Sequence, residues 1–176
     1  MEELINITVL AFRKIITPRY YRTERGFVTE FYKHLSNEIE NSDLFPEGTI
    51  LEAEVQKRED DHYGVTQRPD ILIHIPIESG LTENANENNF VVYAFKLNAN
   101  NGRVDADFVK LEEMFDSLNY GIGFFINIGA HPRTYLYRYN GNYRNRINEF
   151  TIGLTNGQVS INHSYFIGAE IRTVVK

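Results

Sequence analysis

The chain has 176 residues, of which 42% are hydrophobic and 24% charged, and its formal net charge is −6. This composition excludes a disordered chain, and the length suits one domain, residues 1–176, with a sizeable core. Cysteine is absent, which excludes disulfides, thiolate metal sites and a cysteine nucleophile and suits a reducing compartment, so we expect a cytoplasmic protein.

Two helices are predicted before the first strand. Apolar residues recur at helical spacing over residues 4–16, and Pro18 ends this pattern. Polar residues interrupt the same stretch, so neither a signal peptide nor a membrane span is expected. Thr23 suits the N-cap of a second helix, whose apolar stripe runs from Phe27 to Ile39. Glu30 lies beside this stripe, at the edge of the expected core.

Three strands are predicted next. Residues 50–56 alternate between apolar and polar. The run 69–77 begins with Pro69-Asp70 and places its isoleucines on one face. Residues 90–97 are almost wholly apolar, as in a strand buried on both faces, and carry one charge, Lys96.

The rest of the chain predicts one helix and further strands. Asp105 suits the N-cap of a helix, which the apolar strand 122–128 follows. Asn-Gly pairs at 140–141 and 156–157 predict tight hairpin turns within an antiparallel section of about residues 132–176. We therefore expect an α/β fold, with a mixed central sheet flanked by helices and a C-terminal antiparallel β extension.

Charged residues converge if the second and third predicted strands form a hairpin. With Ile77 assumed to lie opposite Asn89, Asp70 lies opposite Lys96. Side chains alternate along a strand, so Ala94 shares a face with Lys96. These three positions then form one small cluster, because opposite residues lie about 5 Å apart.

The order of these elements, with Pro-Asp at 69–70 and Ala-Phe-Lys at 94–96, resembles the PD-(D/E)xK nuclease superfamily over about residues 24–128. In that family a Pro-Asp and an acid-x-Lys on neighbouring strands form a metal site with an acid from the preceding helix. The resemblance implies a restriction-endonuclease-like fold. It assigns the motif Asp to Asp70, the motif Lys to Lys96 and the helix acid to Glu30.

The resemblance implies an enzyme, a Mg²⁺-dependent endonuclease that hydrolyses phosphodiester bonds, with DNA as the expected substrate and restriction or anti-phage defence as the expected role. Mn²⁺ can substitute for Mg²⁺. Asp70 and the carbonyl of Phe95 would bind the metal, and Lys96 would orient or deprotonate the attacking water. Glu30 would support a second metal or a metal-bound water. We expect a homodimer or a partner subunit, because so short a chain has little room for a separate DNA-reading domain.

In the family, the motif acid is a catalytic residue and binds the metal. In this chain, Ala94 occupies the position of that acid. Without that carboxylate the metal affinity falls, and we expect the chain to be inactive or nearly so. Three explanations remain open. Alanine was introduced deliberately, the chain is a natural pseudo-nuclease, or another acid fills the gap, for which Glu30, Glu52 and Glu54 are candidates.

Other interpretations of these residues are a non-catalytic nucleic-acid-binding or scaffolding subunit with a degenerate nuclease fold, and an unrelated interaction module with an Asp70–Lys96 ion pair. The net charge opposes a general nucleic-acid binder, but basic, tyrosine-rich segments at 13–25 and 133–146 suit phosphate and base contacts. On the helix after the third strand, Asp107 and Lys110 could approach a phosphate. An exposed ion pair between them is the favoured interpretation.

Overall fold

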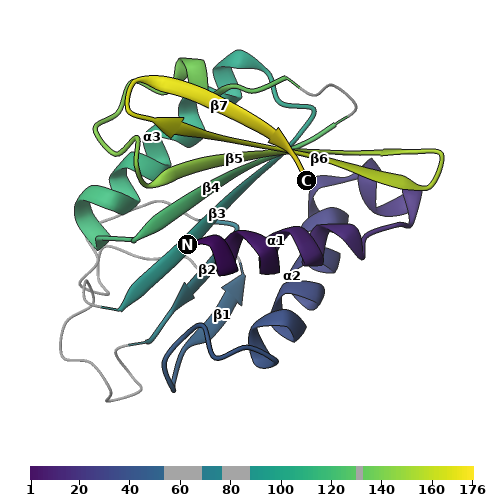
Figure 1. Cartoon of the computed structure of the whole chain (residues 1–176), viewed down its shortest axis with the longest axis horizontal. Helices are drawn as coiled ribbons and strands as arrows, with labels where there is room; N and C mark the ends of the chain where they lie inside the picture. The colour runs from purple at the N-terminus through teal and green to yellow at the C-terminus, as the bar shows by residue number, and fades with distance from the viewer. Residues whose placement is uncertain (54–68, 77–87, 130–132) are drawn as a thin grey trace.

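A seven-stranded mixed sheet forms the centre of the molecule in a computed structural model that describes residues 1–53, 69–76, 88–129 and 133–176 (Figure 1). The strands follow one another across the sheet in sequence order, from β1 to β7. Helices α1 and α2 pack on one face and α3 on the other. The α/β class and the mixed sheet flanked by helices are thus confirmed.

The N-terminal helices are α1 (Glu2–Arg13) and α2 (Glu24–Glu40), joined through a short 3₁₀ helix, η1 (Pro18–Arg22). The predicted cap of α2 is confirmed, because the Thr23 hydroxyl accepts a hydrogen bond from Gly26 N at 3.1 Å. α1 ends before the predicted limit, and Ile16 is 61% exposed.

Strands β1 (Ile50–Ala53), β2 (Ile71–His74) and β3 (Asn89–Leu97) are antiparallel neighbours. The assumed hairpin register is wrong by two residues, because Ile71 pairs with Tyr93 and Leu72 with Val92. Continued one step, this pairing sets Asp70 level with Ala94 rather than Lys96. A shift by an even number keeps every side chain on its face, so the core packing is retained.

Helix α3 (Asn101–Leu118) connects β3 to its parallel neighbour β4 (Ile122–Ile128). The bounds of β4 are as predicted. The predicted cap Asp105 is wrong, because Asn100 caps the helix and accepts a hydrogen bond from Arg103 N at 3.2 Å. Asp105 lies within the first turns and binds Arg138 instead.

The C-terminal strands β5 (Ile147–Thr155), β6 (Gln158–Ile167) and β7 (Glu170–Val175) continue the same sheet. The expected separate antiparallel extension is only partly correct, since β5 pairs in parallel with β4. The turn at Asn156-Gly157 is confirmed by their positive φ angles of 51° and 76°.

The second predicted hairpin, at Asn140-Gly141, is wrong. A 3₁₀ helix, η4 (Leu136–Arg138), precedes this pair, and the following loop is bound to α3. The Glu112 carboxylate accepts hydrogen bonds from the hydroxyl of Tyr139 and from Asn142 N. These contacts to a helix replace the strand pairing that a hairpin needs.

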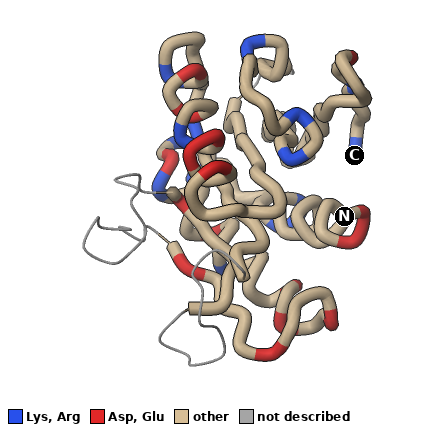
Figure 2. The backbone as a smooth tube through the Cα atoms, turned by 90° about the vertical axis from the view of Figure 1, so that its left-hand side faces the viewer, with Lys and Arg blue, Asp and Glu red and all other residues tan. Residues whose placement is uncertain are grey.

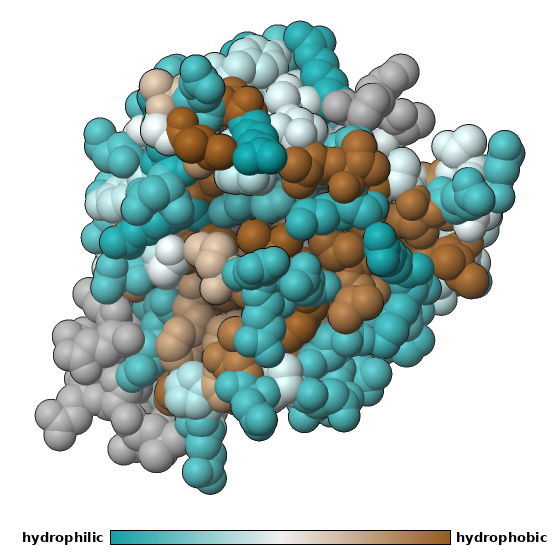
Figure 3. All heavy atoms as spheres, in the orientation of Figure 1, coloured by the Kyte–Doolittle hydropathy of each residue, from teal (hydrophilic) through white to brown (hydrophobic). Residues whose placement is uncertain are grey.

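Apolar residues fill two layers, one between the sheet and α1 and α2, the other between the sheet and α3. Figure 3 shows apolar patches across the middle of one face, where α1 lies in Figure 1, among hydrophilic surroundings. Acidic and basic positions are interspersed along the helices in the view of Figure 2. Within the described residues, no helix combines the length and apolar character needed to cross a membrane.

Replacing Phe31 by alanine tests the first layer. Its ring is fully buried and lies 4.5 Å from the ring of Phe12 and 5.3 Å from that of Phe95, centroid to centroid. Phe31→Ala should lower the free energy of unfolding by about 3–5 kcal/mol, measured by urea denaturation. The control Val109→Ala, at a side chain that is 58% exposed, should change it by less than about 0.5 kcal/mol. Equal losses in both variants would contradict this packing.

Candidate functional site

A small cavity of about 30 Å³ lies where the start of β2, the middle of β3 and α3 meet, which is room for roughly one water molecule or ion. Three of the predicted site residues, Asp70, Ala94 and Lys96, line it together. Two further charged side chains come from α3. The full lining is Pro69, Asp70, Val92, Ala94, Lys96, Asp107, Lys110, Leu111 and Met114.

Asp70 is fixed by the backbone of the neighbouring strand. It directly precedes β2, and its Oδ2 accepts a hydrogen bond from Phe95 N at 2.7 Å. Burial raises the pKa of this carboxyl to about 6, and the hydrogen bond from Phe95 and the charge of Lys96 oppose that rise. The nearby carboxylates of Glu24 and Asp107 push the pKa up further. Asp70 is therefore held in place, and it is mainly ionised only above about pH 6.

Lys96 joins carboxylates from helices on both faces of the sheet. Its Nζ donates to the carbonyl of Phe95 at 2.9 Å. The same Nζ lies 3.2 Å from Asp107 Oδ2 on α3 and 3.9 Å from Glu24 Oε1 on α2. The ammonium group thus sits at the end of β3 between acids, rather than extending freely into solvent.

The helix acid that reaches this cluster is Glu24, and the structure does not bring Glu30 into it. Glu24 Oε2 accepts a hydrogen bond from Leu97 N at 2.9 Å. The Glu30 carboxylate instead pairs with Lys33 at 3.0 Å and His34 at 3.2 Å, and the hydrogen bond from Lys33 lowers its pKa. No spacing in the sequence distinguishes Glu24 from Glu30, and the packing of α2 against β3 is what brings the first residue of this helix to the cluster.

Asp107 and Lys110 form the predicted i,i+3 pair, with 3.4 Å between Lys110 Nζ and Asp107 Oδ1. The expectation that this pair is exposed is wrong for the acid, since Asp107 is only 2% exposed. Burial raises the pKa of Asp107, while Lys96 and Lys110 oppose the rise. The charges of the two lysines therefore offset the cost of burying the Asp107 carboxylate.

Ala94 is 7% exposed and faces α3 from the same side of β3 as Lys96. Of the acids expected to compensate for it, Glu52 pairs with His74 Nε2 at 2.7 Å, and Glu54 lies outside the described residues. Neither Glu52 nor Glu30 lines the cavity. Within the described residues, the acids that do so are Asp70 and Asp107.

The oxygen atoms around this cavity are chemically suited to Mg²⁺, a hard cation that proteins bind through one or two carboxylates while water and phosphate complete its coordination. Asp70, Asp107 and the carbonyl of Phe95 supply such oxygens. Among the described residues no group of three or more His, Asp or Glu side chains is placed to hold a metal ion. Two carboxylates and one carbonyl are thus the oxygens that these residues could offer to a cation, and the ammonium groups of Lys96 and Lys110 lie beside them.

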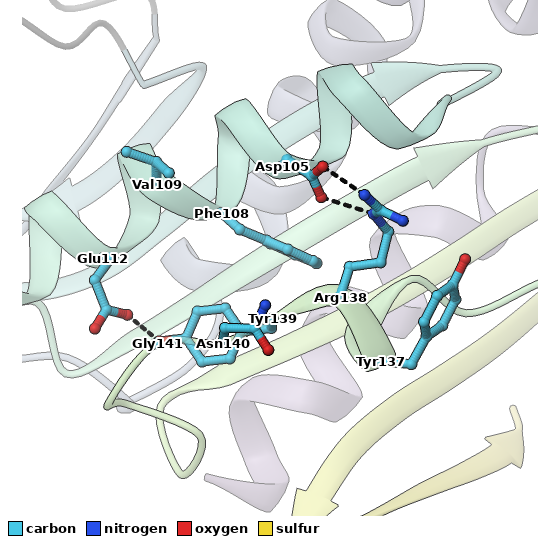
Figure 4. Close-up of a pocket in the computed structure, with 9 residues that line it drawn as sticks. All are labelled: Asp105, Phe108, Val109, Glu112, Tyr137, Arg138, Tyr139, Asn140 and Gly141. Atoms are coloured by element: carbon cyan, nitrogen blue, oxygen red, sulfur yellow. Dashed lines mark hydrogen bonds and ion pairs between the residues drawn. The ribbon is translucent and has the colours of Figure 1, made fainter.

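The two basic segments differ in how their arginines are used. Arg138 donates from Nε and Nη2 to the two oxygens of Asp105 at 2.7 and 2.6 Å, beside a larger cavity of about 480 Å³ between α3 and η4 (Figure 4). Arg146 donates to Tyr120 O at 3.2 Å. In the first segment Arg19, Arg22 and Arg25 are exposed, and Arg133 and Arg144 are exposed in the second. Arg25 directly follows Glu24 in sequence, so the first segment adjoins the cluster at Lys96.

Comparisons of this chain with protein-family models, with curated protein sequences and with solved structures found no match. The functional class of the chain therefore rests on its own residues, above all on the α/β fold with a mixed sheet and on the cavity at Asp70.

Stability against pH tests the environment of Asp70. Folding raises its pKa from 3.8 to about 6, so the unfavourable burial of its charge acts fully above pH 6 and disappears as the pH falls toward 4. Asp70→Asn should therefore raise the free energy of unfolding by about 1–2 kcal/mol at pH 7.5, after allowance for solvent screening, and by much less at pH 4.

Urea denaturation at the two pH values measures this difference. The control Asp43→Asn removes an exposed carboxylate and should give a similar small effect at both. A gain for Asp70→Asn that is the same at pH 4 as at pH 7.5 would show that the buried charge is not its cause.

Proposed function

We propose that this chain is a nuclease domain of the PD-(D/E)xK class, whose chemistry is Mg²⁺-dependent hydrolysis of phosphodiester bonds, with DNA as the substrate. The observation that carries the proposal is the shared cavity of Asp70, Ala94 and Lys96, in which Asp70 accepts from the amide of Phe95. The antiparallel pairing of β2 with β3 brings the two motif fragments together, and α3 closes the cavity over them.

The order of the elements supports a restriction-endonuclease-like core. Helix α2 precedes three antiparallel strands, β1 to β3, and α3 then leads to β4, which is parallel to β3. The Pro-Asp stands at the head of β2 and the lysine near the end of β3, on the face covered by α3. The chain resembles the PD-(D/E)xK superfamily in this same order of elements.

The chain's own residues have distinct roles in this chemistry. A bound Mg²⁺ would polarise the phosphate and lower the pKa of a water molecule. Asp70, anchored by Phe95 N, would supply a carboxylate oxygen to that cation. Lys96, held by the carbonyl of Phe95 and by Asp107, orients the attacking water and offsets negative charge on the phosphate. Glu24, 3.9 Å from Lys96 Nζ, adds a second negative charge beside this ammonium group.

Alanine at position 94 lowers the cleavage expected of the chain as it stands, because one carboxylate fewer surrounds the cation. The alternative proposal is a non-cleaving nucleic-acid-binding subunit. The exposed arginines Arg19, Arg22 and Arg25, the last of which directly follows Glu24, favour contact with phosphates under either proposal. Targeting would then come from a second copy or a partner subunit, as expected in a defence system.

Restoring the acid tests the nuclease proposal. Ala94→Glu should cleave plasmid DNA with Mg²⁺ or Mn²⁺ at least about tenfold faster than the unsubstituted chain, because the added carboxylate strengthens cation binding. Cleavage of single-stranded DNA and of RNA, run in parallel on gels, identifies the substrate. A chelator should abolish the activity.

Second substitutions in the Ala94→Glu background establish which residues act. Asp70→Ala and Lys96→Ala should each remove the cleavage. Asp105→Asn, which removes a carboxylate paired with Arg138 elsewhere on α3, should leave it unchanged. If Ala94→Glu cuts none of the substrates with either metal but the chain still retards DNA on a gel, the non-cleaving subunit is the correct proposal.

A further inference from the structure

We infer that β7 is the contact surface between two copies of this chain, which pair antiparallel about a two-fold axis at Thr173. This inference goes beyond the proposed function, because it holds whether or not the chain cleaves DNA. It identifies the strand through which the homodimer expected from the sequence forms.

Strand β7 lies at the edge of the sheet opposite to β1, with β6 on one side and, among the described residues, no strand on the other (Figure 1). Its pairing with β6 is regular from Glu170 to Val175 and contains no bulge. Residues 158–176 contain no proline. Bulges and prolines are devices that stop an edge strand from pairing with another chain, so β7 is open to such pairing.

The backbone groups that face away from β6 belong to alternate residues of β7. The register of the two strands sets Lys176 opposite Ile161, and Lys176 N donates to Ile161 O at 3.0 Å. Opposite residues of antiparallel strands alternate between bonded and non-bonded pairs, so amides two residues apart share a direction. The N–H and C=O groups that point away from β6 are therefore those of Ile171, Thr173 and Val175.

Hydrogen bonding and charge together restrict how two copies of β7 can pair. The outward-facing residues of one copy must lie opposite those of the other. A two-fold axis at Arg172 would set two arginines opposite each other, and an axis at Val174 would set Arg172 opposite Lys176. An axis at Ile171 or Val175 would pair less than half of residues 170–176. Thr173 is the remaining position for the axis.

An axis at Thr173 satisfies both the hydrogen bonds and the charges. Ile171 of each copy then lies opposite Val175 of the other, and Thr173 lies opposite Thr173, which gives about six backbone hydrogen bonds. Glu170 lies opposite Lys176 of the second copy at both ends of the pairing. Opposite charges in such cross-strand pairs are stabilising, so this strand is complementary to itself.

The apolar side chains of β7 also favour this pairing. Val175 is 81% exposed, which is the largest exposed fraction of any large apolar side chain in the described part of the chain. Ile171 packs at the margin of the apolar layer between the sheet and α3. Side chains alternate along a strand, so Ile171, Thr173 and Val175 share that face. The Ile171–Val175 contacts would therefore continue this layer across the two-fold axis and cover Val175.

Sedimentation velocity of the whole chain, from about 5 to about 200 µM, tests the contact, because a pairing of this size lies at the small end of specific interfaces. The unsubstituted chain should shift from monomer to dimer across this range. Thr173→Pro should remain a monomer, because it removes an outward N–H at a place where an edge strand tolerates proline. The control Thr173→Val keeps that N–H and should associate within about twofold of the unsubstituted chain. Circular dichroism checks that both variants are folded.

Exchanging the charges of Glu170 and Lys176 tests the register without a change in the backbone. Glu170→Lys sets two lysines opposite each other and Lys176→Glu two glutamates, so each should weaken association by at least about threefold. The double variant Glu170→Lys/Lys176→Glu keeps the net charge of the unsubstituted chain and should restore association to within about twofold. The control Glu47→Lys lies before β1, at the opposite edge of the sheet, and should leave association unchanged.

Amide hydrogen exchange, followed by NMR at the two ends of this concentration range, locates the contact on the strand. The amides of Ile171, Thr173 and Val175 should exchange at least about tenfold more slowly at the high concentration, because the pairing protects them. The amides of Arg172 and Val174 already face β6 and should change much less, so they are internal controls.

A chain that stays monomeric throughout this range would overturn the inference. A dimer that Thr173→Pro leaves intact, or that the charge exchange does not restore, would also overturn it, because the contact would then lie elsewhere or in another register. None of these results bears on the nuclease proposal, which the cleavage assays of Ala94→Glu test separately.

Discussion

The site depends on the position of the Lys96 ammonium group. It lies at the end of a buried strand, 3.2 Å from a carboxylate of α3 and 3.9 Å from a carboxylate of α2. Those helices pack on opposite faces of the sheet, so a single charge links both layers of the protein. Asp107 can remain buried because this lysine and Lys110 stand beside it. This arrangement gathers the carboxylates of Glu24 and Asp107 at the same end of β3.

Much of the fold could be predicted because its signals are local. The apolar stripe from Phe27 to Leu35 faces the core, as its periodicity predicts, and β4 has the predicted bounds because a mainly apolar run lies between Gly121 and Gly129. The turn at Asn156-Gly157 can be predicted from these two residues alone, because asparagine and glycine adopt the positive φ angles that the turn requires. Asn140-Gly141 carries the same signal, but the contacts of Glu112 with the residues around it override the local preference. An Asn-Gly pair shows that a segment can form a tight hairpin turn, and its tertiary contacts determine whether the hairpin forms.

The site was predictable only in part, because its members are joined by contacts that no spacing encodes. Asp70, Ala94 and Lys96 meet as the strand order requires, even though the assumed register was two residues off, because an even shift preserves the face. The choice between Glu24 and Glu30 could not be made from helical periodicity. Both lie on the same helix, and the one that reaches the site does so because it caps the amide of Leu97 at the end of β3.

The acids predicted to compensate for Ala94, Glu30, Glu52 and Glu54, all belong to the part of the chain before β3. The acid of α3 that lines the cavity, Asp107, follows that strand. The crossover from β3 to the parallel strand β4 must return across the sheet, and this brings α3 back over the residues that lead into it. A side chain from the second turn of α3 therefore comes to lie across the cavity from Ala94. The buried acid of the cavity therefore belongs to an element that follows β3, which the spacing of the residues before β3 cannot indicate.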